Sequence, residues 1–271
     1  MFSKRLIKPE LLDHLPPEEA RPNLADLVRI NKNFGGHSVL RKTLARVAGP
    51  TERFTLLDVG AASGDTARLI QELFPRASIF SLDHNAVNLG NAPHPKLLAD
   101  AFRLPFKPGS FDFVLSSLFL HHFEDARVVE LLRNFYETAR RGLLICDLER
   151  HVVPYFFLPA SKVLFRWQPI TIHDGVISVR ASFRANELLH LSREAGIEAP
   201  EVRVHRPAFR LSLVALKNGA AEIPLGQRTG GYSEEDTHRG RTSRNAGCAN
   251  SLVRPPDGAQ NAMPNSSVVP A

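Results

Sequence analysis

The chain has 271 residues, enough for one large domain or two small ones with a buried core. Its net charge of +6 is not gathered into a lysine/arginine block or a basic stripe interleaved with aromatic residues, which disfavours nucleic-acid binding. It contains no apolar stretch of the roughly 20 residues that span a membrane, no signal-peptide core and no metal-ligand or disulfide spacing of its two cysteines. We therefore expect a cytoplasmic protein without a metal, whose basic surplus suits acidic or membrane-proximal substrates and leaves peripheral membrane contact open.

Residues 1–50 have the apolar periodicity of short helices and predict an N-terminal helical cap. Pro9 is placed to open a first helix, because proline favours the first helical turn. A second helix is expected from about Asn23 and a third over residues 37–47, with a glycine-containing interruption at 33–36 between them.

From residue 54 to residue 217, strands and helices alternate, which predicts an α/β fold with a largely parallel sheet covered on both faces. The expected strands are 54–59, 78–82, 96–99, 111–116, 142–147, 201–206 and 209–217. Helices are expected from Asp125 to about residue 139 and over residues 185–195. The last two strands are joined by only three residues and must therefore run antiparallel, as a hairpin.

The sequence Leu-Leu-Asp-Val-Gly-Ala-Ala-Ser-Gly-Asp at 56–65 predicts a strand, a glycine turn and the start of a helix. The spacing Gly60, Ala62, Gly64 differs from the three-glycine pattern that seats a dinucleotide pyrophosphate. Asp58 would repel a pyrophosphate but attract a cation. Because the sulfonium and ammonium groups of S-adenosylmethionine are both positive, these residues point to S-adenosylmethionine as the cofactor.

Acidic residues follow the next two predicted strands. Asp83 comes 23 positions after Gly60, where a carboxylate can accept both ribose hydroxyls of an adenosine, although an aspartate capping a turn is the alternative. Asp100 and Ala101 follow the third strand and are placed to meet the adenine edge, with a turn-forming aspartate as the alternative.

Polar residues also follow the fourth predicted strand, at the edge where open α/β sheets bind ligands. Ser116 ends that strand, and His121 and His122 come soon after it. A histidine there is a candidate general base, because its ordinary pKa lies near neutrality. One of the two histidines could instead pack or cap the following helix.

Taken together, these motifs resemble the class I S-adenosylmethionine-dependent methyltransferases, in particular a bacterial subgroup acting on small molecules. The resemblance covers about residues 54–217 and rests on the segments LDVGAASGD, SLDHN, LLADAF, LPFKPGSFDFVLSS and LHHF. It implies a Rossmann-like seven-stranded mixed sheet of order 3-2-1-4-5-7-6 with helices on both faces, in a domain of residues 51–217. Ala62 departs from the pattern, because most members have glycine at that position.

The resemblance also implies roles for the residues already singled out. The methionine end of the cofactor would be lined by Asp58, Gly60, Ala62 and Gly64. Asp83 would hold the ribose, Asp100 and Ala101 the adenine, and Ser116 would lie on the substrate side. His122 is the first choice for the base, since several quinone- and phenol-methylating relatives carry a histidine there, and His121 is the second.

Residues 148–183 form an insertion that would build a substrate lid in this family, although a helical pair that only packs on the sheet is equally compatible with the sequence. Asp147, Arg150 and His173 are polar candidates for substrate binding in or beside it. Its apolar and aromatic run suits a hydrophobic or aromatic acceptor, so O-methylation of a phenol or quinol is the expected reaction.

Residues 218–271 are rich in Gly, Ser, Asn, Pro and Thr and predict a disordered tail. Two other functions remain open from sequence. One is a binding or scaffold protein that keeps the fold without catalysis, which the intact Asp58, Asp83 and Asp100 disfavour. The other is a nicotinamide oxidoreductase, which the missing third glycine disfavours.

Overall fold

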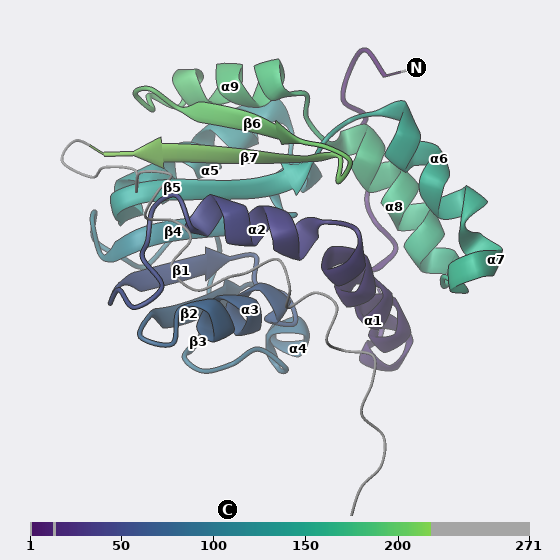
Figure 1. Ribbon diagram of the computed structural model, residues 1–271, viewed down its shortest axis with the longest axis horizontal. Coiled ribbons are helices and arrows are strands. Elements are labelled where there is room, and N and C mark those ends of the chain that lie inside the picture. The colour runs from purple at the N-terminus through teal and green to yellow at the C-terminus, as the bar shows by residue number, and fades with distance from the viewer. Residues whose placement is uncertain (1, 13–14, 218–271) are drawn as a thin grey trace, which may run out of the picture. The chain divides into compact units, whose positions relative to one another are not determined.

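The structure is a computed structural model that describes residues 2–12 and 15–217 (Figure 1). The predicted tail, residues 218–271, lies outside the described residues.

Seven strands form one mixed sheet of order β3-β2-β1-β4-β5-β7-β6. The strands are β1 Thr55–Val59, β2 Ser78–Asp83, β3 Lys96–Leu98, β4 Phe111–Ser117, β5 Ala139–Leu148, β6 Glu201–His205 and β7 Arg210–Leu216. Strands β1 to β5 are parallel, whereas β7 runs antiparallel to both β5 and β6. The predicted sheet order and the terminal hairpin are therefore confirmed.

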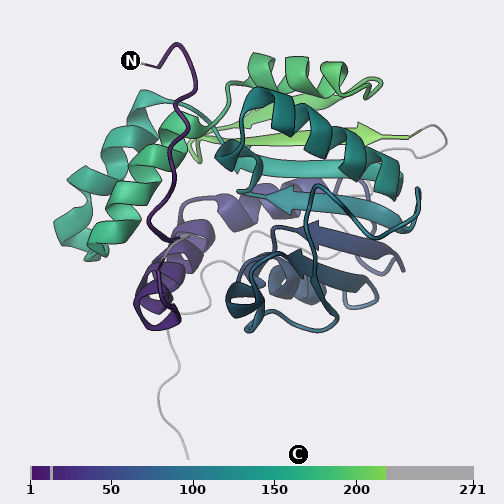
Figure 2. The ribbon, with the colours of Figure 1, turned by 180° about the vertical axis from the view of Figure 1, so that it is seen from behind.

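Helices cover both faces of the sheet, as predicted (Figures 1 and 2). On one face, α2 (Gly36–Leu44) and α3 (Asp65–Leu73) pack over side chains such as Leu56 and Leu115; on the other, α5 (Asp125–Thr138) and α9 (Ala185–Glu194) pack over Leu57 and Val114. Neighbouring strand residues thus enter opposite cores, because side chains alternate along a strand. The short α4 (Ala86–Leu89) follows β2.

Strand β5 begins at Ala139, three residues before the predicted start at 142, and follows α5 without a loop. Its first residue pairs with Phe111, and an irregularity in the ladder between Phe111 and Phe113 absorbs the extra residue. Ala139, expected as the last residue of the helix, is instead buried at the start of the strand.

The N-terminal region differs from the prediction. Helix α1 spans Pro17–Asn33, with proline in its first turn, and so begins well before Asn23. The helix predicted to open at Pro9 was wrong, because residues 2–10 contain no helix. The amide of Leu6 donates instead to the carbonyl of Arg180, at 3.1 Å. We call residues 2–12 the N-terminal strap.

Between β5 and α9 lie three helices, α6 (Val152–Ala160), α7 (Lys162–Phe165) and α8 (Pro169–Ala181). Helices α6 and α8 pack against each other, and α8 also contacts α1 (Figure 1). Within the described part of the chain, every helix is too short or too polar to cross a bilayer. The division into cap, domain and insertion stays a prediction.

Candidate active site

A cavity of about 1330 Å³ lies at the carboxyl ends of the parallel strands. Its walls come from the N-terminal strap, α1, α2, the turns after β1, β2 and β4, the insertion helices and the turn between β6 and β7. In the sheet, β1 lies between β2 and β4. From β1 the chain first builds β2 and β3 on one side and then crosses to build β4 and β5 on the other side. Ligands of open α/β sheets bind at such a switch point.

The turn after β1 forms one wall of this cavity through Gly60, Ala61, Ala62 and Ser63. Gly60 and Gly64 both have a φ of +74°, and Ala62 has a φ of +44°. A Cβ on Gly60 would lie 2.5 Å from the ring of Phe119, and one on Gly64 would lie 2.6 Å from the Cα of Ala92. Protein packing and backbone conformation therefore require these glycines, in addition to the ligand approach expected from sequence.

Carboxylates gather behind and beside this turn. Asp83 lines the cavity, and its two carboxylate oxygens accept hydrogen bonds from the amides of Ala62 and Asn85, each at 2.9 Å. Asp58 is buried in β1 and does not line the cavity. Its Oδ2 is buried with no hydrogen-bond partner among the described residues. Burial first, and then the charges of Asp83 and Asp65, raise the pKa of Asp58 to about 7.

This arrangement fits a cofactor with a ribose and a cationic tail. Each oxygen of Asp83 retains a second lone pair for a ribose hydroxyl. Asp65, at the start of α3, also lines the cavity, so negative charge surrounds the turn. The unpartnered oxygen of Asp58 favours a positive charge nearby.

Four other residues predicted to bind the cofactor lie off the cavity wall, Gly64 in the turn itself and Asp100, Ala101 and Ser116. Asp100 is exposed and accepts the amide of Phe102 at 2.9 Å, as a turn-forming aspartate does. Ala101 is buried in the core. The hydroxyl of Ser116 donates to the carbonyl of Val59 at 3.0 Å, joining β4 to β1, and the next residue, Ser117, lines the cavity in its place.

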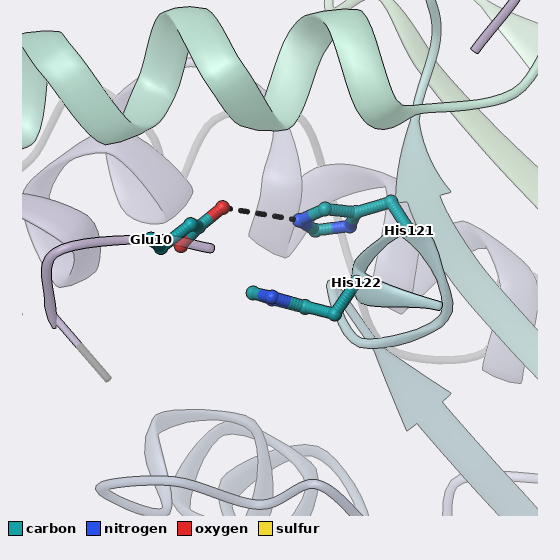
Figure 3. A group of neighbouring side chains, drawn as sticks. All are labelled: Glu10, His121 and His122. Atoms are coloured by element: carbon teal, nitrogen blue, oxygen red, sulfur yellow. Dashed lines mark ion pairs between the residues drawn. The ribbon is translucent and has the colours of Figure 1, made fainter. Parts of the chain in front are cut away.

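The two histidines occupy a short 3-10 turn after β4, Leu120–His122, and both line the cavity (Figure 3). Nδ1 of the buried His121 lies 2.7 Å from Oδ1 of Asp147 at the end of β5. Its Nε2 points toward Oε1 of Glu10 in the strap, at 3.8 Å (Figure 3). Burial alone would lower the pKa of His121, but the charges and hydrogen bonds of Asp147 and Glu10 outweigh burial and raise it to about 9.

The pKa values of the two carboxyl groups that face His121 are lowered, whereas that of His121 is raised. Burial would raise the pKa of Glu10 and of Asp147, yet the hydrogen bond to His121 and the positive charge nearby hold both below their ordinary values. The hydroxyl of Ser178 in α8 also donates to Glu10. The three groups form a buried ion-paired chain, Asp147–His121–Glu10, in which both ring nitrogens of His121 are protonated at neutral pH and the imidazole is positively charged.

His122 stacks on His121, with ring centroids 4.4 Å apart, and is only half-buried. One ligand atom each of Glu10, His121 and His122 lies within 4.8 Å of the others, so the three side chains could hold a metal ion. The ring nitrogens of His121, however, already face carboxylates on both sides, which stabilises a bound proton.

Glu10 was missed by sequence reasoning. Its partners His121 and Ser178 are far away along the chain, so no local spacing could reveal it. Phe119, which lines the cavity beside Gly60, was also missed.

Arg150 and His173, predicted as substrate-binding residues, are not on the cavity wall. The buried guanidinium of Arg150 donates to the carbonyls of Phe2 and Ser182, at 3.1 and 2.6 Å, and pairs with Glu187. His173 is half-exposed and contacts Asp174, whose carboxylate accepts the amides of Leu11 and Leu12, each at 3.0 Å. These residues of the insertion hold the strap in place.

Comparison with known proteins identifies a domain within the chain. Residues 57–146 match a family model described as a methyltransferase domain. A search of curated protein sequences finds no match.

Several solved structures are similar to this chain at low sequence identity. The plantazolicin methyltransferase BpumL, in complex with a pentazolic desmethylPZN analog and SAH, is 15% identical over 76% of this chain and 93% of that chain, with a TM-score of 0.57. Human N-acetylserotonin methyltransferase in complex with SAM is 16% identical over 70% of this chain and 53% of that one, with a TM-score of 0.49. An O-methyltransferase candidate from Nostoc punctiforme is 18% identical over 67% and 55%, with a TM-score of 0.49.

The chain thus spans about half the length of the human and Nostoc proteins and nearly all of BpumL. The domain match contains the glycine turn, Asp83 and the histidine pair, and it lies within the sheet whose order the class I resemblance predicted. Residues 57–146 therefore match a methyltransferase domain, and the sheet that contains them has the strand order implied by the resemblance to class I S-adenosylmethionine-dependent methyltransferases.

Proposed function

We propose that the protein methylates a hydroxyl oxygen, most simply that of a phenol or quinol, on a hydrophobic small molecule. The observation that carries this proposal is the position of His122, half-buried in the cavity wall beside a histidine that already holds its proton. A phenol must lose a proton as its oxygen gains the methyl group, and His122 is placed to accept it.

The rest of the cavity supports a hydrophobic acceptor. Much of its wall is apolar, from α1, the strap, the insertion helices and the turn after β4. These residues include Ile7, Leu24, Leu27, Val28, Phe34, Phe119, Phe123, Phe157, Leu158 and Val179. Polar side chains, including those of Glu10 and Ser178, also reach the wall near the histidines and could fix the orientation of such a ligand.

S-adenosylmethionine, when bound, supplies an electrophilic methyl group on a sulfonium sulfur. Asp83 would accept the ribose hydroxyls, while Asp58 and Asp65 would favour the positive charge of the methionine end. The acceptor oxygen would take this methyl group, and His122 would accept the phenolic proton as the oxygen is methylated. Holding the reacting atoms in line contributes most of the acceleration, about 7–11 kcal/mol in well-oriented reactions.

The ion-paired chain Asp147–His121–Glu10 acts as a positioning device. It fixes the ring on which His122 stacks and ties that ring to both β5 and the strap. Because His121 is protonated at neutral pH, it is not the group that takes the proton from the acceptor.

The test is methyl transfer to a panel of phenols and quinols, with S-adenosylhomocysteine binding measured in parallel. We expect His122→Ala to lower kcat by about 10²–10⁴-fold without changing the affinity for S-adenosylhomocysteine. Asp83→Ala should instead weaken that affinity, whereas Asp100→Ala, on the exposed turn, should not. His190→Ala is the matched control, because His190 is exposed on α9. Unchanged turnover in His122→Ala would reject the base assignment.

A further inference from the structure

The insertion carries an apolar surface that the proposed reaction does not use. In α7, Val163 is 89% exposed and Leu164 is 77% exposed, and in α6, Phe156 is 57% exposed, with Val152 and Val153 also exposed. We call these five residues the apolar tip. In Figure 1 they belong to the two helices that lie on the far side of α8 from the sheet. Leaving such large side chains in water opposes the hydrophobic effect.

Helix α6 lacks a charged face that water would solvate. Its sequence, Val-Val-Pro-Tyr-Phe-Phe-Leu-Pro-Ala, contains no charged residue. Phe157 and Leu158 line the cavity, while Val152 and Phe156 face outward. A surface helix normally carries charged residues on its outer face, and a helix that is apolar all round requires a second apolar environment.

The charged residues of the segment 152–168 are both positive. Lys162 and Arg166 flank Val163 and Leu164, and both are exposed. Neither forms an ion pair with any other described residue. The segment from 152 to 168 contains no Asp or Glu. Apolar side chains bordered by lysine and arginine are typical of helices that bind the surface of an anionic membrane.

The apolar tip is continuous with the cavity. Val153 is both exposed and part of the cavity wall, so the same helix forms the outer surface and the inner lining. A bilayer covering the tip would lie next to this wall, and a lipophilic molecule could pass from the membrane to the cavity without crossing bulk water.

We propose that the apolar tip docks onto the surface of an anionic lipid membrane, where Val163 and Leu164 enter the interface and Lys162 and Arg166 contact lipid headgroups. This proposal rests on the proposed function only in making the acceptor a membrane-dissolved molecule. Docking itself is independent of methyl transfer, so binding and turnover can fail separately.

The experiment uses the full-length protein and vesicles of phosphatidylcholine with or without 30% phosphatidylglycerol, read by flotation. The single tryptophan, Trp167, is buried and stacks on Phe165, so its fluorescence gives a second readout beside the tip. We expect the wild type to prefer the anionic vesicles. Val163→Ser with Leu164→Ser should weaken partitioning about a hundredfold. Lys162→Gln with Arg166→Gln should weaken binding to anionic vesicles about fivefold per charge.

Leu98→Ser is the matched control, because Leu98 is 63% exposed but lies on the edge strand β3, away from the insertion. It should bind vesicles like the wild type, and circular dichroism should show all variants folded. Wild-type protein that binds neither vesicle, or a serine double variant that binds as well as the wild type, would overturn the proposal. Self-association abolished by the serine substitutions, without vesicle binding, would assign the tip to a second copy of the chain instead.

Discussion

Asp58 is a buried acidic side chain whose negative charge lowers the stability of the folded protein near neutral pH. Its pKa is about 7 instead of the ordinary 3.8, so near and above neutrality the folded protein holds a buried charge that the unfolded chain would hold in water. For an acid with a raised pKa, the stabilising contribution is present below pH 3.8 and is lost as the pH rises through 7. At a pH above both pKa values, this shift lowers the free energy of unfolding by about 4 kcal/mol.

Replacing this acid with its neutral isostere should therefore stabilise the protein without cofactor. At pH 8 we expect the free energy of unfolding of Asp58→Asn, measured with urea, to exceed that of the wild type by about 4 kcal/mol. At pH 4 the two free energies should be nearly equal. The same variant should bind S-adenosylmethionine more weakly, which calorimetry measures. A variant that is less stable than the wild type at pH 8 would show that the ionised carboxylate has a partner in the folded protein.

At the scale of elements, the turn from β1 to α3 packs so closely against its neighbours that a side chain at its glycines would collide with them. Gly64 and Gly196 both have positive φ, +74° and +82°, but a Cβ on Gly64 would meet Ala92, whereas one on Gly196 would meet nothing within 4 Å. We expect Gly196→Ala to cost about 1–2 kcal/mol for conformation alone. Gly64→Ala should cost about 1–3 kcal/mol more, because the obstacle is backbone.

Urea unfolding of the two alanine variants measures this difference directly. Equal losses would mean that the loop containing Ala92 moves aside at little cost. In that case the glycine at position 64 serves the backbone conformation only.

The elements also differ in how well the sequence predicts them. Each central strand is a short apolar run bounded by turn residues, and the order of the sheet came from a resemblance that those runs carry. The helix expected at Pro9 failed because the strap makes its hydrogen bonds to Arg180 and Asp174, which no local pattern announces. Glu10 entered the site in the same way, through contacts with residues distant in sequence.

At the scale of the whole described molecule, the chain Asp147–His121–Glu10 connects the sheet to the N-terminal strap. The pKa of His121 is raised from 6.5 to about 9, so its contribution to stability is complete below pH 6.5 and is lost as the pH rises through 9. The shift corresponds to about 3 kcal/mol. The carboxyls, whose pKa values are lowered, contribute above their ordinary values and lose that contribution in acid.

The free energy of unfolding of the wild type, relative to that of His121→Gln, should therefore fall by about 3 kcal/mol between pH 6.5 and pH 10. Chemical denaturation at several pH values measures the two curves. For His190→Gln, at an exposed position of α9, the free energy of unfolding should depend on pH as it does in the wild type. Parallel curves for His121→Gln as well would mean that the imidazole is neutral in the folded protein.

The strap also bears on the order in which the molecule is completed. Arg5 donates to the carbonyls of Ala181 and Phe123, at 2.7 and 2.8 Å, and Glu10 accepts from Ser178. These residues are synthesised before their partners, and contacts between distant positions form slowly. The contacts of the strap with α8 can therefore form only after α8 has been made. The part of the cavity wall that contains Glu10 is consequently completed later than its own synthesis.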